Sequence, residues 1–381
     1  MNRKHRTGLG KPVVYFAPFQ KALSKFDVMK RVLDAIDFGK TVKPGDLTAV
    51  KVHFGEAGND SYLNPEFSAL MVEAVKAAGG KPFLTDTCTL YTGQRRNGVD
   101  HLNLALRHGF SPATVGAPIL LADGLKSNDW REVPIGGKYF EAVKIAGGIV
   151  DADSMVVLSH FKGHVSGGFG GAVKNLAMGC ASATGKKEQH ALKLVVDAET
   201  CIGCGRCARN CPANAITMER DEKTHALIHK DPCIGCTECM THCPVDAIDM
   251  DWRGEGKLED FGGRMAEYAL GAVKTKVRPL FVNVMMNITP LCDCAGWSDD
   301  VVAPNIGIAA STDPVALDWF CYHKVNEVVG VDHHHEGCLF CSLHPKTDPL
   351  SQLRHGGEIG LGTDDYDVCL LDVPAENGGH E

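Results

Sequence analysis

An eighteen-residue cysteine motif occurs twice in this chain, and it constrains the fold more than any other feature of the sequence. The first copy is CIGCGRCARNCPANAITM, residues 201–218, and the second is CIGCTECMTHCPVDAIDM, residues 233–250. Ten of the eighteen aligned positions are identical, and the copies hold eight of the chain's sixteen cysteines. The N-terminal apolar stretch is broken by Pro12, Pro18 and Gln20, so it makes a poor signal peptide. Clustered cysteines in an unexported chain indicate metal or redox chemistry rather than disulfides.

Each copy follows the pattern C-x2-C-x2-C-x3-C-P, which is typical of iron–sulfur ligation by thiolates. In this spacing the fourth cysteine of each copy serves the other cluster, so we predict two interlocked 4Fe-4S clusters. The ligands expected for the first cluster are Cys201, Cys204, Cys207 and Cys243. Those expected for the second are Cys233, Cys236, Cys239 and Cys211. Zinc is the alternative, but zinc sites use well-separated C-x2-C pairs with four ligands at a time.

The residues between the cysteines suit the same interpretation. Pro212 and Pro244 turn the chain away after the last ligand of each copy, and Gly203 and Gly235 allow backbone amides to approach sulfur. The residues expected to shield the clusters from water are Ile202, Ile216, Ile234 and Ile248. Over about sixty residues the segment resembles bacterial two-cluster ferredoxins.

Outside the repeat, short apolar runs alternate with helical patterns. The strands expected are 12–16, 47–53, 81–85, 119–121, 155–159, 279–283, 306–310 and 367–371. Asn64 with Pro65, and Asp313 with Pro314, predict two helix starts. The alternation predicts an α/β fold with a mainly parallel, helix-covered sheet. The body is discontinuous: we expect its first part over residues 1–193, a small α+β ferredoxin-like insert over 194–251, and its second part over 252–381.

A glycine-rich stretch, SHFKGHVSGGFGGAVKNLAMGC, runs from Ser159 to Cys180. A predicted strand ends at His160 and a predicted helix begins at Ala172, and this junction offers free backbone N–H groups to an anion. No nucleotide-binding fingerprint matches. The glycines of the candidate anion loop are Gly167, Gly168, Gly170 and Gly171. The candidate catalytic groups around it are His160, Lys162, His164 and Lys174. The alternative is a tight turn with solvated basic residues.

Several weaker signals remain. Cys292, Cys294, Cys338 and Cys341 could form a third metal site, with a ligand from His333, His334 or His335, although inert buried cysteines are common. Cys88 and Cys180 are candidate thiol nucleophiles or structural cysteines. Lys51, His53 and Glu56 follow a strand and either reach the sheet edge near His160 or lie in a solvated loop. Asp313 is expected to cap a helix and Asp86 to form a turn.

Five segments resemble the proteins catalogued as domain of unknown function 362. They are KVHFGE (51–56), TDTCTLYTGQRRNG (85–98), HFKGHVSGGFGGAVKNLAMGC (160–180), ITPLCDC (288–294) and STDPVALD (311–318). Many members carry an inserted ferredoxin pair at this place. The resemblance implies iron–sulfur binding but brings no defined reaction.

These observations favour a redox function. We expect a ferredoxin-type oxidoreductase or its subunit, in which the clusters exchange electrons with a small-molecule substrate, or an additional metal or anionic cofactor, in the body. An electron-transfer module that docks on a redox partner protein, and a protein that handles metal or clusters, are the alternatives. The net charge of −8 argues against nucleic-acid binding. No run reaches eighteen apolar residues, so we expect no membrane span and a cytoplasmic location.

Overall fold

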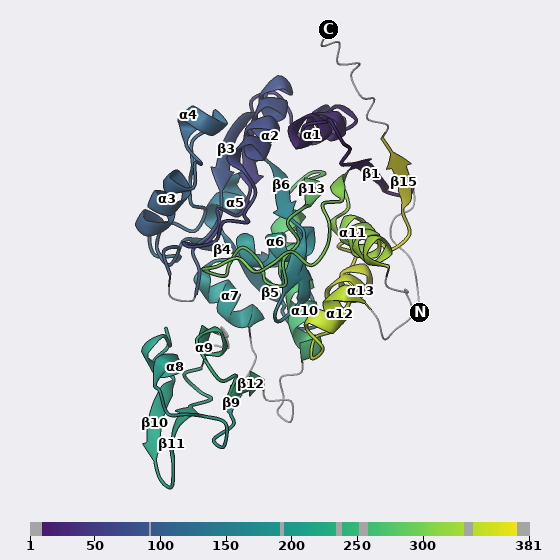
Figure 1. Ribbon diagram of the computed structural model, residues 1–381. Coiled ribbons are helices and arrows are strands. Elements are labelled where there is room, and N and C mark those ends of the chain that lie inside the picture. Colours follow the sequence, from purple (N-terminus) through teal and green to yellow (C-terminus); the bar gives the residue numbers. More distant parts are fainter. Residues whose placement is uncertain are drawn as a thin grey trace.

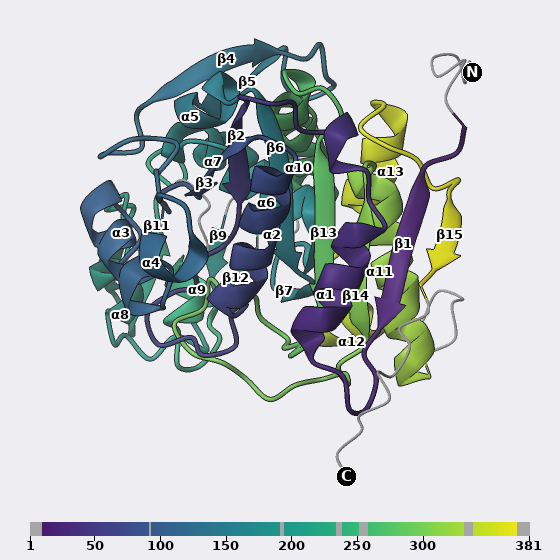
Figure 2. The ribbon, with the colours of Figure 1, turned by 90° about the horizontal axis from the view of Figure 1, so that it is seen from above.

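The computed structural model describes residues 10–90, 93–190, 194–233, 238–250, 258–330 and 338–371. Its centre is a seven-stranded sheet in the order β15-β1-β14-β13-β6-β2-β3 (Figures 1 and 2). The strands are β1 (Val13–Pro18), β2 (Leu47–Lys51), β3 (Lys81–Thr85), β6 (Ser154–His160), β13 (Leu280–Met285), β14 (Gly307–Ser311) and β15 (Asp367–Leu370). Four of the six neighbouring pairs are parallel, and β14 is antiparallel to both of its neighbours. The predicted α/β fold with a mainly parallel sheet is confirmed.

Helices cover both faces of this sheet, and the alternation of side chains along each strand explains why. On β6, Val156 and Leu158 belong to the apolar cluster under α1 (Lys25–Asp34) and α2 (Pro65–Ala77). Met155 and Val157 point the other way, into the cluster under α6 (Ala172–Gly179), α10 (Leu258–Lys274) and α11 (Pro314–Val329). A strand buried on both faces reads as a continuous apolar run, which is how β6 appears in the sequence.

The predicted helix starts agree with the structure. The Asn64 side chain accepts the N–H of Glu66 at the start of α2, and Asp313 accepts the N–H groups of Val315 and Ala316 at the start of α11. Seven of the eight predicted strands belong to the central sheet. The exception is 119–121, where Ile119 makes only an isolated bridge to Leu84 at the edge of β3.

The other elements surround this framework. The remaining helices are the 3₁₀ turn Phe38–Lys40, α3 (Gly98–Arg107), α4 (Pro112–Val115), α5 (Gly147–Asp151), α7 (Ala183–Gln189), α12 (Leu339–Leu343) and α13 (Ser351–Glu358). Two hairpins pair β4 (Trp130–Pro134) with β5 (Ala142–Ala146), and β7 (Lys162–His164) with β8 (Gly168–Gly170). None of the helices in the described part of the chain combines the length and the apolar character needed to cross a membrane.

The cysteine-repeat segment, residues 194–250, forms two β-α-β units that lie beside the sheet body (Figure 1). The first contains β9 (Leu194–Val196), α8 (Arg206–Arg209) and β10 (Ile216–Arg220). The second contains β11 (Thr224–Ile228), α9 (Glu238–Thr241) and β12 (Ile248–Met250). β10 pairs with β11, and β9 pairs with β12, so the first strand of the first unit lies beside the last strand of the second unit.

Candidate functional site

A cavity of about 560 Å³, called the main cavity below, opens where β2, β3, β6 and β13 end. His53 and Glu56 follow β2, Asp86 follows β3, His160 ends β6, and the loop 291–297 follows β13. Ligands of open α/β sheets bind at the carboxyl ends of the strands, and the volume is that of a site for a small molecule. Lys51, His53 and Glu56 therefore share one site with His160 rather than lying in a solvated loop.

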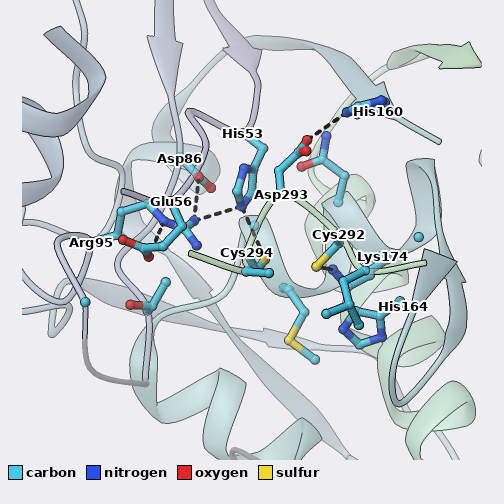
Figure 3. Close-up of a pocket in the computed structure, with 18 of the residues that line it drawn as sticks. His53, Glu56, Asp86, Arg95, His160, His164, Lys174, Cys292, Asp293 and Cys294 are labelled. Atoms are coloured by element: carbon cyan, nitrogen blue, oxygen red, sulfur yellow. Dashed lines mark hydrogen bonds and ion pairs between the residues drawn. The ribbon is translucent and has the colours of Figure 1, made fainter. Parts of the chain in front are cut away.

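The loop after β13 carries Cys292 and Cys294 into the main cavity on a tight turn. The N–H of Ala295 donates to the carbonyl of Cys292 over 3.0 Å, which closes a four-residue turn around Asp293. The N–H of Glu56 donates to the Asp293 carbonyl over 2.9 Å and ties this turn to the loop after β2. Both sulfurs face the cavity, while the Asp293 carboxylate points the opposite way, toward His160 (Figure 3).

Asp293 is clamped by two of the predicted catalytic residues. Its Oδ1 lies 2.7 Å from Lys162 Nζ and its Oδ2 lies 2.9 Å from His160 Nδ1, with all three side chains buried. The other ring nitrogen of His160 lies 2.6 Å from the Met286 carbonyl. Both ring nitrogens therefore have partners inside the protein. These contacts give His160 and Lys162 the role of positioning Asp293, and the catalytic role that the sequence suggested for them stays a prediction.

The Asp293 carboxylate stays ionised because of these neighbours. Burial alone would raise its pKa, but His160 and then Lys162 hold the pKa of Asp293 well below its usual range. A buried carboxylate with two cationic partners is a rigid anchor, and it fixes the turn from which Cys292 and Cys294 project.

The two thiols contact cationic and imidazole groups from other elements. Lys174, on α6, has its Nζ 3.5 Å from Cys292 Sγ. His53 Nε2 lies 3.3 Å from Cys294 Sγ and 2.8 Å from Arg95 Nη1. Figure 3 shows both sulfurs between these side chains. Lys174 thus lies in the main cavity, where its ammonium group contacts a cysteine sulfur.

Cys292 and Cys294 differ in how readily each loses its proton. A hydrogen bond from Cys292 lowers the pKa of Cys294 well below the usual thiol value; burial opposes this, and Lys174 and His53 reinforce it. The same hydrogen bond, together with burial, raises the pKa of Cys292. Burial alone would lower the pKa of Lys174, but Cys292 and Cys294 raise it overall, so the ammonium stays charged. The cavity therefore holds a thiolate on Cys294 beside a protonated Cys292.

His164, another predicted catalytic residue, lines the same cavity as a neutral ring. Its Nδ1 accepts the N–H of Gly167 over 3.0 Å and that of Ser166 over 3.3 Å. Burial, followed by the charge of Lys174, lowers the pKa of His164 well below its usual value. The ring hydrogen therefore resides on Nε2, which makes His164 a neutral donor.

The glycine-rich stretch folds differently from the prediction. Gly168 and Gly170 lie in the β7–β8 hairpin, and the first N–H groups of α6 are already taken. The amides of Ala172 and Val173 donate to the two oxygens of buried Asp318, over 2.8 and 2.9 Å. The prediction of an external anion at this helix start is therefore wrong, because the chain supplies its own carboxylate from α11.

Packing explains the glycines of this loop. A Cβ at Gly171 would lie 2.3 Å from Asp318 Oδ1, and one at Gly168 would lie 2.5 Å from Pro349 Cβ. A Cβ at Gly167 would meet His164 Nδ1 at 3.3 Å, and one at Gly170 would meet Lys174 Cδ at 2.8 Å. Gly170 and Gly171 do line the main cavity.

Most of the remaining charged side chains around the cavity form internal pairs, whereas Lys186 donates to the carbonyls of Cys88 and Ala181. Lys51 Nζ lies 2.9 Å from Asp86 Oδ1, and Arg95 Nε lies 2.9 Å from Glu56 Oε2. Asp86 is thus a buried ion-pair partner, and its expected role as a turn former is wrong. Motif spacing gave no signal for Arg95 and Asp86, although both lie in the segment TDTCTLYTGQRRNG. Because these pairs neutralise each other, the charge of Lys174 dominates near the two sulfurs.

The other candidate cysteines have no thiolate character. Burial and the carboxylate of Asp123 raise the pKa of Cys88 to about 12, and burial raises the pKa of Cys180 to about 11. Cys338 and Cys341 form a disulfide with each other, so neither has a thiolate to share with Cys292 and Cys294. The predicted third metal site is therefore not assembled, and the histidines at 333–335 lie outside the described residues.

The cysteines of the repeat line two small pockets in the predicted crossed arrangement. Cys201, Cys204, Cys207 and Cys243 line one of them. Cys211, Cys233 and Cys239 line the other, and Cys236 lies outside the described residues. A cubane cluster takes one thiolate on each iron, so its cysteines ring a cavity rather than converge on a point. In the described ranges, no three His, Cys, Asp or Glu side chains converge on a single metal ion.

Backbone geometry repeats around the two pockets. The N–H of Ala215 donates to Cys211 Sγ and that of Ala247 to Cys243 Sγ, both over 3.2 Å. Asn214 and Asp246, one residue earlier, have φ values of 49° and 50°, a left-handed conformation that Asn and Asp tolerate. Amide hydrogen bonds to sulfur are what thiolate ligands of clusters accept. The donor set and its amides fit a cluster in each pocket.

The apolar cover of these pockets is partly as expected. Ile216 and Ile248 are buried, whereas Ile202 lines the first pocket with 57% of its surface exposed, so it covers that pocket only in part. Ile234 lies outside the described residues. Cys204 is also exposed. The first pocket therefore approaches the surface of the molecule.

The second pocket approaches the main cavity. Glu238, on α9, lines both the pocket of Cys211, Cys233 and Cys239 and the main cavity. His242, whose Nε2 lies 2.8 Å from Glu238 Oε1, also lines the main cavity. One short helix of the cysteine repeat thus separates the second pocket from the sheet body.

The chain matches a known protein family over the residues that build this site. The model of the domain of unknown function 362 (DUF362) matches residues 48–323, which is most of the chain. The chain belongs to the DUF362 family. The match includes the residues of the main cavity and spans the cysteine repeat. No curated protein matches this DUF362 member.

Solved structures give a distant likeness. One is the lactate racemase apoprotein from Thermoanaerobacterium thermosaccharolyticum, with 13% identity and a TM-score of 0.37. The alignment covers 72% of this chain and 50% of that chain, so the DUF362 member spans about half the length of the protein it matches.

Proposed function

We propose that this DUF362 protein is an iron–sulfur electron-transfer protein that exchanges electrons with a redox site in its own α/β body. One 4Fe-4S cluster would be held by Cys201, Cys204, Cys207 and Cys243, and the other by Cys233, Cys236, Cys239 and Cys211. Such clusters supply one-electron transfer. The crossed arrangement of cysteines around the two pockets, with an amide donating to each fourth sulfur, supports this assignment.

The observation that carries the proposal is the position of α9. Glu238 borders both the second cysteine pocket and the main cavity, so the two sites share one wall. An isolated electron carrier needs no such cavity, whereas an oxidoreductase needs its substrate site close to its electron source. The chain's own residues in this cavity bind and orient the reacting group: Lys174 supplies a positive charge and His164 a neutral hydrogen-bond donor.

A redox partner protein is the second component of the proposal. Ile202 is 57% exposed and the nearby Cys204 is also exposed, so the first cysteine pocket lies at the surface of the molecule. The second cysteine pocket instead borders the main cavity. An exposed apolar side chain beside a cluster ligand suits a transient docking contact with an electron donor or acceptor.

The test is anaerobic purification followed by measurement of iron and acid-labile sulfide per chain. Two cubanes require about eight of each. Cys243→Ala should lower the iron content by about half, and electron paramagnetic resonance of the reduced protein should lose one centre. Cys369→Ala is the matched control, because Cys369 lies on β15 at the far edge of the central sheet. Full iron content in Cys243→Ala, or stoichiometric zinc in place of iron, would contradict the proposal.

A further inference from the structure

We propose that Cys292 and Cys294 are a redox-active dithiol that exchanges with a small, negatively charged disulfide in the main cavity. Three observations carry this inference: the turn that brings the two sulfurs together, the groups that contact each sulfur, and the cavity that admits a small molecule. The inference deepens the proposed function and rests on it for the source of electrons.

The turn allows a disulfide between residues two apart. Extended chain would separate such Cα atoms by about 7 Å, slightly more than the 4.4–6.8 Å range of disulfides. The hydrogen bond from Ala295 N–H to Cys292 O bends the chain and shortens this separation. Both cysteines are free thiols in this structure, and they are in hydrogen-bond contact with each other. Asp293, anchored by His160 and Lys162, holds the turn in this shape.

The contacts of the two sulfurs differ, and this difference assigns their roles. Cys294 Sγ lies 3.3 Å from His53 Nε2 and receives the hydrogen bond of Cys292, so Cys294 is the attacking thiolate. Cys292 keeps its proton beside Lys174 and is the resolving thiol. The lowered pKa of Cys294 agrees with this order of reaction.

The chemistry balances in two steps. Cys294 thiolate attacks a disulfide RSSR, forming a Cys294–SR bond and releasing one RS⁻. Cys292 then attacks Cys294 Sγ, closing the Cys292–Cys294 disulfide and releasing the second RS⁻; the Cys292 proton passes to one released thiolate. Two thiol equivalents of protein are oxidised and one RSSR is reduced to RS⁻ and RSH. Regeneration of the thiol and thiolate takes two electrons and one proton, which in the proposed function derive from the one-electron donors of the cysteine repeat.

The charge of the cavity defines the class of substrate. Lys51 and Lys162 are ion-paired with Asp86 and Asp293, whereas Lys174 contacts a cysteine. A disulfide carrying carboxylates would place a negative charge on Lys174 as its sulfurs reach Cys294. The cavity volume of about 560 Å³ admits a small disulfide but not a folded protein.

The first experiment follows the pair in the full chain, purified anaerobically. The protein is equilibrated in reduced and oxidised dithiothreitol buffers, quenched with N-ethylmaleimide, and analysed by peptide mapping. We expect both labels on the peptide containing Cys292 and Cys294 to disappear together in a single two-electron transition. Cys369→Ser should leave this transition unchanged. Independent labelling of the two cysteines, or full labelling in the most oxidising buffer, would overturn the inference.

The second experiment identifies the nucleophile and the substrate charge. With the dianionic disulfide 5,5′-dithiobis(2-nitrobenzoate), Cys292→Ser should accumulate a mixed disulfide on Cys294, and Cys294→Ser should form one on Cys292 at least tenfold more slowly. Lys174→Met should slow the reaction with this reagent severalfold more than the reaction with dicationic cystamine, because it removes the anion contact as well as one charge that favours the thiolate, and Lys174→Arg should restore it. Equal slowing with both reagents, or trapping on Cys292 instead, would refute the assignment.

Iron is measured on the same samples, which separates the two proposals. A chain that holds about eight iron atoms but whose cysteine pair does not cycle overturns this inference alone. A chain whose pair cycles but which binds no iron overturns the proposed function alone.

Discussion

Replacing Asp293 with asparagine tests the clamp that positions the two cysteines. Lys162 Nζ and His160 Nδ1 lie 2.7 and 2.9 Å from the carboxylate oxygens. At an effective dielectric constant of about 20, the Lys162 pair gains about 6 kcal/mol of gross attraction, most of which offsets the cost of burying the charges. A neutral amide at this position would leave the buried Lys162 ammonium without its counter-charge, so we expect Asp293→Asn to lower the unfolding free energy by about 3–5 kcal/mol at pH 7.

The pH dependence gives a second readout. The pKa of Asp293 is lowered in the folded chain, so its contribution is present above the unfolded value of about 3.9 and is lost as the pH falls below it. The difference between wild type and Asp293→Asn should therefore shrink in acid. Urea unfolding followed by circular dichroism measures both quantities.

Two further variants make this prediction refutable. Asp300→Asn is the matched control, because Asp300 is exposed and lies seven residues further along the same segment. In Asp293→Asn with Lys162→Met, the loss should be smaller than the sum of the single losses by about 0.5–3 kcal/mol. A loss in Asp293→Asn no larger than in Asp300→Asn, or strict additivity of the pair, would refute the clamp.

Other substitutions test the packing and the buried titratable groups. Gly171→Ala should lower the unfolding free energy by about 1–3 kcal/mol in the same assay, because its Cβ would lie 2.3 Å from Asp318 Oδ1. Gly357→Ala is the control, because a Cβ there would meet nothing within 4 Å, and it should be neutral or stabilising. Equal effects of the two substitutions would contradict this account. Burial lowers the pKa of His101 to about 3, so its contribution is present above the unfolded value of about 6.5 and is lost as the pH falls from there toward 3. His101→Leu should therefore flatten the fall in unfolding free energy over that interval by up to about 1.4 kcal/mol per pH unit, and an unchanged slope would exclude His101 as the cause.

The sequence predicted the elements of the fold better than their arrangement. The central strands are visible because each is a short apolar run between turn-forming residues, and helix starts at Asn64 and Asp313 are visible because capping is local. The antiparallel direction of β14 is not visible, because an apolar run such as Gly307–Ser311 reads the same in either direction.

In the site, too, features set by neighbouring residues were predictable from the sequence, and contacts between distant residues were not. The cysteine spacing alone predicted which sulfurs share a pocket, because the crossed pattern is a property of the motif. The contact between His160 and Asp293 was not predicted because the two residues lie 133 positions apart. The helix start at Ala172 looked free to bind an anion because its partner Asp318 lies 146 residues away. Contacts of this separation depend on the sheet order, which no local pattern encodes.

The order of strands in the sheet has a consequence for how the protein is made. β1 pairs with β14 and β15, so β1 has to wait for strands that are made about 290 residues or more later in the chain before it can pair. The hairpin β10–β11 and the pair β9–β12, by contrast, use only residues 194–250. The cysteine repeat can therefore pair its own strands during synthesis, before the later strands of the central sheet are made, and the proposed clusters would then be inserted while the body is still incomplete.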